Sequence, residues 1–363
     1  EGSKAIAIAA ESGADFVDLN CGCPIHDATR RGLGSALLTS PPKLGKLVNG
    51  LVQAGNENNI PVTVKIRLGY RGDDINARRV VTELREAGAA AVTIHGRTAQ
   101  QGYKKTADWD LIRQVVEDGN DSCVPVVGNG DISTHYEARR RMEESGVDSV
   151  MVGRAALTKP WIFGEFRDGK DWDPDMNERI AIYRTLSCYM KEHFGDDELG
   201  RKRTWTFLPW HCDFFARYMP LPEETYGSLS IERPLIQSRL VPEKSSPLEC
   251  LMANRNPKTY DLISAALWES DSDADAVAKL ATLAESHEFQ EIQNSKDLSD
   301  NSEVKELSNI PKKERKEWRK KRTPKPKRTP EEIIAIRAER AAKRAASGST
   351  YVHNDGARRN YHS

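Results

Sequence analysis

The sequence lacks long apolar runs, paired cysteines and a recognisable leader. No apolar stretch approaches the roughly 20 residues that a membrane-spanning helix needs, so we expect no membrane partner. Residues 1–15 have neither a basic region nor a long apolar core, so we expect no signal peptide. The six cysteines are scattered without a CxxC pair, which disfavours a zinc ribbon or a disulfide-stapled secreted fold. We expect an intracellular, reducing compartment, namely the cytoplasm, with the nucleus or an organelle as alternatives.

The chain also lacks a net charge, but this absence hides a strong asymmetry. Lys and Arg number 54, and so do Asp and Glu. Residues 311–363 nevertheless hold 17 basic against 6 acidic side chains, whereas residues 1–310 hold 37 against 48. An acidic body with a basic tail points to a polyanionic partner.

What the sequence does contain is a regular alternation over residues 1–166. Short apolar runs rich in β-branched residues predict strands, and amphipathic stretches between them predict helices. The predicted strands are 16–19, 62–66, 91–94, 124–127 and 149–152, and the predicted helices are 36–54, 75–87, 109–117 and 134–145. Gly13, Gly88 and Gly146 each precede a strand, where we expect left-handed helix caps. Continuous apolar strands alternating with helices indicate a buried parallel sheet, either a barrel or a doubly wound sheet.

Polar clusters at the strand ends favour the barrel. Each predicted strand is followed by one of the segments 20–24, 65–67, 95–98, 128–131 and 153–154. A (β/α)₈ barrel places its active site on this rim, with a phosphate site after strands seven and eight. The five strands would then be numbers four to eight. The fold class that we predict is an α/β TIM barrel lacking its first three strands, with Glu1 inside the helix before strand four.

Three domains are predicted from the change of pattern along the chain. Residues 1–170 form the barrel and residues 175–290 a smaller all-helical domain. Residues 291–363 form a charged linker and basic tail, which we expect to be disordered. Within the helical domain we expect helices over 176–194, 202–218 and, more weakly, 257–291.

A phosphate-bearing cofactor is the first chemical inference. Gly128–Asp131 offers backbone N–H groups freed by glycine before a predicted helix N-terminus, and Arg154 adds a bidentate cation. Taken singly, each segment also suits an ordinary strand-end turn. Two such loops on consecutive strands favour phosphate binding.

Lys65 and His95 are the next candidates. Lys65 ends an apolar strand and is expected to face the barrel mouth, where a buried ammonium needs an anionic partner. A reduced flavin offers such a charge, and an ion pair with Asp18 is the alternative. His95 is either a satisfied core histidine or, with Arg97 and Thr98 beside it, part of a ligand-facing rim.

Cys23 carries the strongest chemical signal. A thiol on a loop near a flavin can act as a general acid that gives a proton to carbon while hydride arrives from the other face. Cys21 is more simply a buried apolar residue. Arg30 and Arg31 follow on a glycine-rich loop, which suits a substrate with phosphates.

Six sequence motifs, in their order and spacing, resemble those of the tRNA-dihydrouridine synthase family over about residues 8–166. They are Asn20-Cys21-Gly22-Cys23-Pro24, Arg30-Arg31-Gly32-Leu33-Gly34, Val64-Lys65-Ile66-Arg67, Ile94-His95-Gly96-Arg97-Thr98, Gly128-Asn129-Gly130-Asp131-Ile132 and Val152-Gly153-Arg154. The family consists of FMN-dependent barrels with a helical tRNA-binding domain, which reduce the C5–C6 double bond of uridine in tRNA with NADPH. The eukaryotic members that act in the variable-loop region are the most similar.

The resemblance implies a role for each matching residue. Cys23 corresponds to the proton donor to C5, and Asn20 to a residue near the flavin and the target base. Lys65 and His95 correspond to contacts of the flavin ring, and Arg97 to a contact of FMN or RNA. The FMN phosphate site corresponds to Asn129, Gly130, Asp131, Gly153 and Arg154.

Two other functions remain open at this point. One is an FMN-dependent small-molecule oxidoreductase of the dihydroorotate dehydrogenase or ene-reductase type, and the other is a non-catalytic RNA-binding fragment. The tRNA partner would contact the helical domain through cations and aromatic rings, although aromatic residues at helical spacing are more often core. The residues concerned are Arg201, Lys202, Arg203, Trp205, Trp210 and Phe214. We expect a monomer.

Overall fold

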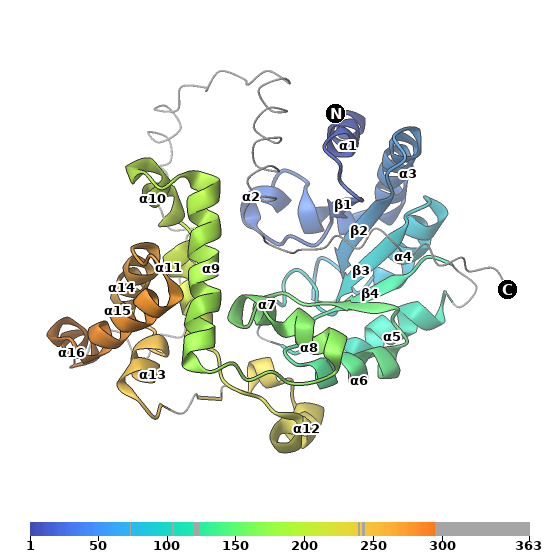
Figure 1. The fold of residues 1–363 in the computed structure, drawn as a ribbon. Helices are drawn as coiled ribbons and strands as arrows, with labels where there is room; N and C mark the ends of the chain where they lie inside the picture. The colour runs from blue at the N-terminus through green and yellow to red at the C-terminus, as the bar shows by residue number, and fades with distance from the viewer. Residues whose placement is uncertain (73, 104, 120–122, 239, 242–243, 295–363) are drawn as a thin grey trace. The chain divides into compact units, whose positions relative to one another are not determined.

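A single parallel sheet organises the first half of the chain. The computed structural model describes residues 1–363 except 73, 104, 120–122, 239, 242–243 and 295–363. Its strands are β1 (Val17–Asn20), β2 (Val62–Arg67), β3 (Ala91–His95), β4 (Val126–Asn129) and β5 (Ser149–Met151). They pair in chain order, β1-β2-β3-β4-β5, all parallel (Figure 1). The register sets Asn20 beside Lys65, and His95 beside both Arg67 and Asn129. Residues from different sequence motifs are therefore neighbours at the carboxyl ends of the strands.

Helices precede, connect and follow the strands of this sheet. In the sheet-forming half they are α1 (Gly2–Glu11), α2 (His26–Thr29), the 3₁₀ helix η1 (Gly34–Thr39), α3 (Pro41–Glu57), α4 (Ala77–Glu86), α5 (Trp109–Glu117), α6 (His135–Ser145), α7 (Arg154–Thr158) and α8 (Ile162–Asp168). Each of α3, α4, α5 and α6 packs against the next, so these helices follow one another as the strands do. Gly13, Gly88 and Gly146 all have positive φ (75°, 85° and 67°), which confirms the expected left-handed conformation.

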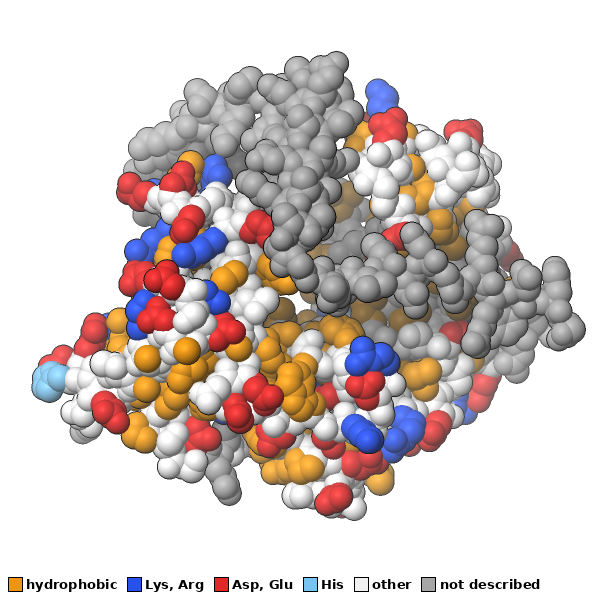
Figure 2. Space-filling model, in the orientation of Figure 1, with side chains coloured by type: hydrophobic (Ala, Val, Ile, Leu, Met, Phe, Trp, Pro, Cys, Tyr) orange, Lys and Arg blue, Asp and Glu red, His pale blue; other side chains and the backbone are white. Residues whose placement is uncertain are grey.

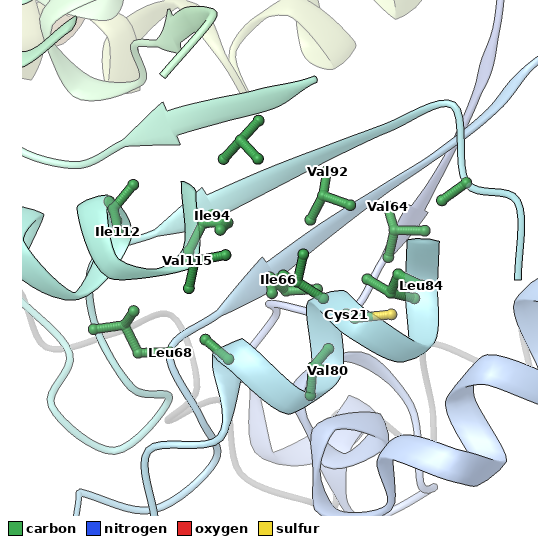
Figure 3. Close-up of a cluster of buried hydrophobic side chains, with 14 of the residues drawn as sticks. Cys21, Val64, Ile66, Leu68, Val80, Leu84, Val92, Ile94, Ile112 and Val115 are labelled. Carbon is green, nitrogen blue, oxygen red and sulfur yellow. The ribbon is translucent and has the colours of Figure 1, made fainter. Parts of the chain in front are cut away.

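The core lies between the sheet and α3–α6. Val64 and Ile66 of β2 and Val92 and Ile94 of β3 are completely buried against α4 and α5 (Figure 3). Since successive side chains of a strand point to opposite faces, Lys65 lies on the other face of the sheet. The helix-covered face is thus apolar, and the opposite face carries the polar side chains.

A second core holds the helices that follow. They are α9 (Met176–Phe194), α10 (Glu198–Thr204), α11 (Leu208–Phe215), α12 (Glu223–Glu232), the 3₁₀ helix η2 (Leu235–Gln237), α13 (Pro247–Met252), α14 (Pro257–Trp268), α15 (Asp273–Glu285) and α16 (His287–Asn294). Ile180, Tyr183 and Phe215 pack in this core, with the rings of Tyr183 and Phe215 stacked at 3.8 Å. Asp175 begins α9 with a capping box to Glu178.

Three predicted helices are wrong at their boundaries. Proline lacks an N–H group and is tolerated only in the first turn, so Pro41 starts α3 after a break at Ser40 instead of continuing a helix from residue 36. Pro209 similarly lies in the first turn of α11, which begins at Leu208, and the helix predicted over 202–218 is two helices. The stretch 257–291 is three helices, α14 to α16. Strand boundaries differ by one or two residues.

The chain divides by its contacts into the units Glu1–Ser299 and Asp300–Ser363. The second unit, like most of the predicted tail 291–363, lies outside the described residues. The predicted boundaries 1–170, 175–290 and 291–363 remain predictions. Among the described helices, none combines the length and the apolar character required to cross a membrane.

Candidate active site

A cavity of about 330 Å³ lies at the carboxyl ends of the strands. It gathers residues from the carboxyl ends of all five strands and the loops after them, although the first and last of these, Asn20 and Arg154, are 134 positions apart in the chain. The predicted site residues that line it are Asn20, Cys23, Lys65, His95, Asn129, Gly130, Asp131, Gly153 and Arg154. Arg30, Arg31 and Arg97 are not among its lining residues.

The loop after β1 is shaped by the side chain of Asn20. Its Oδ1 accepts hydrogen bonds from the backbone N–H groups of Gly22 (2.9 Å) and Cys23 (3.0 Å). The carbonyl of Gly22 accepts a bond of 2.7 Å from Nε of Arg67. This loop is therefore held from both sides, and Cys23 is partly exposed at the cavity.

Cys21 has the opposite environment. It is completely buried in the sheet core, and burial raises the pKa of its thiol to about 12. The two neighbouring cysteines are thus separated by environment, with one sulfur in the core and the other at the cavity.

Gly34 lets the following loop approach Cys23 closely. Its φ is +61°, and a Cβ at this position would lie 2.6 Å from the carbonyl oxygen of Cys23. The N–H of Ser35 donates to the same carbonyl at 2.9 Å. Only glycine satisfies both the backbone conformation and the close approach.

Lys65 points into the cavity and does not form the alternative ion pair with Asp18. Its Nζ donates to Oδ1 of Asn129 at 3.1 Å, whereas Asp18 accepts a bond from Thr63. Burial, together with repulsion from Arg67 and against the attraction of Asp18, lowers the pKa of Lys65 to about 8. The ammonium is therefore poised to lose its proton just above neutrality.

His95 is buried beside four cations. Burial first, and then the charges of Arg67, Lys65, Arg97 and Arg154, lower its pKa to about 2. The imidazole is consequently neutral across the physiological range. It can form hydrogen bonds in this cavity but does not act as a cationic general acid near neutral pH.

Asp131 is the buried anion that holds two arginines in place. Its Oδ1 accepts from Nη2 of Arg154 at 3.0 Å, and its Oδ2 accepts from Nη2 of Arg97 and from the N–H of Ala107 at 2.8 Å. Gln237 also donates to Oδ2, at 2.9 Å. Although Asp131 lines the cavity, its carboxylate is saturated by protein donors.

Arg97 is not among the residues that line the cavity, and its contact with FMN or RNA remains a prediction. The side chain is completely buried, and each of its three nitrogens has a protein partner. Buried charges must be paired within the protein, and the partner, Asp131, lies 34 residues farther along the chain, where no sequence pattern links it to Arg97. Arg97 reaches the cavity through the lining residues that it contacts, His95, Asp131 and the ring of Tyr103.

The N-terminus of α6, which the sequence suggested as an anion site, is filled by the protein's own carboxylate. Glu137, completely buried, accepts bonds from the N–H (2.9 Å) and the hydroxyl (2.7 Å) of Ser133. In contrast, no side chain caps α7, whose N-cap is Gly153 and whose first residue is Arg154. Arg154 and the backbone around Gly153 are therefore the more accessible anion-binding groups.

Arg30 and Arg31 lie on the surface just after α2. They are exposed and belong to the loop that Gly34 presses against Cys23. The structure does not bring them into the cavity, and their contact with a substrate remains a prediction.

Three residues of the site escaped sequence reasoning. Arg67 is buried and lines the cavity, and alternation along β2 places it on the same face as Lys65, a signal that could have found it. Tyr103 lies over Arg154, with 4.2 Å from its ring centroid to Cζ. Ile236 of η2 lines the cavity from far along the chain, and only tertiary structure reveals it.

The aromatic and basic residues predicted for RNA contact have mixed environments. Trp210 is 46% exposed and Arg201 is exposed, whereas Trp205 and Phe214 are half-buried. Phe215 and Tyr218 are core. On the face that Figure 2 shows, acidic and basic side chains are interspersed over this region without a patch of one sign. No group of three or more His, Cys, Asp or Glu side chains suited to a metal occurs in the described part of the chain.

Comparisons with known proteins identify several similar chains. A protein from Coprinopsis cinerea named tRNA-dihydrouridine(47) synthase [NAD(P)(+)] is 38% identical over 272 residues, covering 72% of this chain and 39% of that protein. One of the same name from Cryptococcus neoformans is 42% identical, covering 58% and 30%. A human protein named tRNA-dihydrouridine(47) synthase [NAD(P)(+)]-like is 41% identical, covering 57% and 31%. The chain thus spans between 30% and 39% of the length of these relatives.

Among solved structures, nitroalkane oxidase from Streptomyces ansochromogenes aligns with a TM-score of 0.27 and 17% identity, over 42% of this chain and 37% of that one. A similarity that low does not bear on the fold. The family model described as dihydrouridine synthase, in contrast, matches residues 2–215, which is more than half of the chain and includes every residue of the cavity except Ile236. The chain belongs to the dihydrouridine synthase family.

Proposed function

We propose that the chain is the catalytic part of a tRNA-dihydrouridine synthase, which reduces the C5–C6 double bond of uridine in tRNA to 5,6-dihydrouridine. The observation that carries the proposal is the position of Cys23. Its partly exposed thiol lines one cavity together with Lys65, His95 and Arg154. A thiol that can donate a proton and cationic side chains that can bind an anion therefore line the same cavity.

The fold proposed for this activity is a (β/α)₈ barrel of which the five strands are numbers four to eight. Support comes from the sheet order, since strands that pair strictly in chain order lack the reversal that defines a doubly wound sheet. The two outer strands are partly exposed, with Phe16 before β1 at 56% and Met151 of β5 at 37%. Residues 175–290 are proposed as the tRNA-binding domain.

FMN is the proposed cofactor, and the cavity lining suits it. Lys65, Arg67 and Arg154 are cationic, and neutral His95 adds a further donor, so the polar wall favours a ligand rich in acceptors. Arg154, Gly153 and Asn129 would hold the phosphate end, with Gly130 as the close backbone approach. Asp131 would position Arg154. When bound, FMN would supply the hydride of the reduction, and NADPH or NADH the electrons that restore it.

The protein's own chemical contribution is the proton. Saturating a C5–C6 double bond adds one hydride and one proton, and the Sγ–H of Cys23 would give that proton to C5. Asn20 and Arg67 fix the loop that carries the thiol. Cys21 is excluded as the donor because its sulfur is buried in the sheet core.

The proposed substrate is a uridine that has left its stack in tRNA. A base can enter a cavity of this kind only when it is extruded from the folded RNA. Arg30 and Arg31, exposed on the loop beside Cys23, would contact the neighbouring phosphates. The names of the relatives, which include tRNA and NAD(P)(+), agree with this substrate and electron donor.

A reconstitution experiment tests the proposal. The chain is incubated with FMN, NADPH and an unmodified tRNA transcript, and the digested RNA is analysed by mass spectrometry. We expect a flavin absorbance spectrum in the purified protein and a uridine that gains two hydrogens. Turnover of free uracil derivatives without reaction on tRNA would instead indicate a small-molecule oxidoreductase. Binding of tRNA without any bound flavin would indicate a non-catalytic RNA-binding protein.

A further inference from the structure

Arg97 holds its neighbour His95 through a side-chain hydrogen bond. It is a completely buried side chain whose Nε donates to the carbonyl of Lys105 at 2.7 Å and whose Nη2 is paired with Asp131. The remaining nitrogen, Nη1, lies 3.1 Å from Nε2 of His95. The Lys105 carbonyl and Asp131 thus fix the orientation of the guanidinium independently of its contact with His95.

The direction of this hydrogen bond follows from chemistry. A guanidinium has only donors and keeps its proton in proteins, so Nε2 of His95 must be the acceptor. An imidazole that accepts at Nε2 is neutral and carries its single proton at Nδ1. The low pKa of His95 agrees with this state but is not needed to establish it.

The position of the ring leaves Nδ1 available. The edge formed by Nε2 and Cδ2 faces Gly130, where a Cβ would lie 3.2 Å from Cδ2. Nδ1 has no hydrogen-bond partner among the described residues, and it is not among the fully buried polar atoms that lack one. Because His95 lines the cavity, Nδ1–H is its free donor.

We propose that Arg97 is a positioning residue that fixes His95 in the Nδ1–H tautomer, so that His95 presents a neutral N–H donor to a conjugated carbonyl or ring-nitrogen acceptor of a pyrimidine-type ring. The choice of ring rests on the proposed function. Such an acceptor occurs both on the pyrimidine end of the flavin and on uracil. A neutral donor stabilises negative charge on that acceptor without competing for the proton that Cys23 provides.

The tautomer is measured directly in the free protein. Long-range ¹H–¹⁵N correlation spectra of the ¹⁵N-labelled chain report which imidazole nitrogen is protonated, and the His95→Asn variant assigns the signal. We expect Nδ1 protonated in the wild type, loss of this single tautomer in Arg97→Met, and its retention in Arg97→Lys, which keeps a donor. A wild-type His95 protonated at Nε2 or at both nitrogens overturns the proposal. So does an unchanged tautomer in folded Arg97→Met.

The donor is tested by binding. An Asn side chain can place an amide N–H near the position of Nδ1, whereas Gln reaches the position of Nε2. We expect binding of FMN, or of a uridine-containing RNA if the acceptor is the base, to keep nearly wild-type affinity in His95→Asn and to weaken about tenfold in His95→Gln. Equal weakening of both variants overturns the donor role.

Further titrations separate the two sources of the acceptor. A shift of the Nδ1 proton with FMN alone assigns the acceptor to the flavin, and a shift only after a uridine-containing RNA is added assigns it to the base. A shift with neither overturns the donor role. Failure to bind any FMN would remove the proposed function, whereas the tautomer of the free protein would still confirm or refute the role of Arg97.

Discussion

At the scale of single residues, Lys65 gives the site a pH dependence with a definite sign. Its pKa of about 8 means that the ammonium is present below pH 8 and is lost above it. An anionic ligand such as FMN should therefore bind most tightly below pH 8. Its affinity should fall above that value by at most about tenfold per pH unit, the limit for one linked proton.

Fluorescence titration of FMN between pH 6.5 and 9.5 measures this dependence. Lys65→Gln should bind more weakly and show no decline over the same range. Lys43→Gln, which removes an exposed lysine of α3, is the matched control and should behave as the wild type. A wild-type affinity that is constant from pH 7 to 9.5 would mean that Lys65 does not contribute its charge to the ligand.

The residues differ in how far the sequence alone could place them. The inward orientation of Lys65 follows from alternation along β2, and its place in the cavity is as predicted. The burial of Arg97 could not be predicted, because it depends on Asp131 from another strand loop and on Lys105. Hydrophobic periodicity reports which face a residue occupies, but not which charges meet there. The chemical roles of Cys23 and Asn20 remain predictions.

At the scale of elements, Glu137 connects α6, the loop before it and η2. Its Oε2 accepts from Ser133, and its Oε1 accepts from the N–H of Leu235 at 2.9 Å. Glu137→Ala would leave these buried donors unpaired, each at a cost of about 1–3 kcal/mol. We expect the free energy of unfolding to fall by about 3 kcal/mol in chemical denaturation.

A second variant on the same helix controls for the loss of a glutamate. Glu143 of α6 is exposed, and Glu143→Ala should change the free energy of unfolding by no more than about 0.5 kcal/mol. Similar stabilities for the two variants would refute the role of Glu137 as the connection between these elements.

The elements themselves were predicted with uneven success. All five strands and the helices α5, α6 and α9 lie close to their predicted positions, because they combine clear periodicity with caps such as Thr134 and Asp175. The helix starts at Pro41 and Leu208 differ from the prediction, since the amphipathic pattern continues across both breaks. Contact of η2 with the cavity lies beyond sequence reasoning, because Gln237 and Asp131 are 106 residues apart.

At the scale of the whole molecule, the segregation of charge predicts a role for residues 311–363. This prediction rests on the sequence, because these residues lie outside the described part of the chain. If the 17 basic residues bind tRNA phosphates, log Kd should depend less steeply on log salt concentration after residues 311–363 are deleted.

A length-matched control separates charge from chain length. Replacing the Lys and Arg residues of 311–363 by Gln should reduce the salt dependence as much as the deletion does. An unchanged slope in both variants would show that the tail is not an RNA anchor.

In the proposed reaction, Cys23 gives the proton in the reduction of tRNA uridine. This role is tested most directly by comparing wild type, Cys23→Ala and the control Cys123→Ala, an exposed cysteine that does not line the cavity, in single-turnover reactions with tRNA after the bound flavin has been reduced. The measurement is the amount of dihydrouridine by mass spectrometry, together with the flavin absorbance of each protein. We predict equal flavin content in all three, dihydrouridine from wild type and Cys123→Ala, and a loss of at least about 100-fold in the rate for Cys23→Ala. Dihydrouridine formed by Cys23→Ala at the wild-type rate would contradict the account.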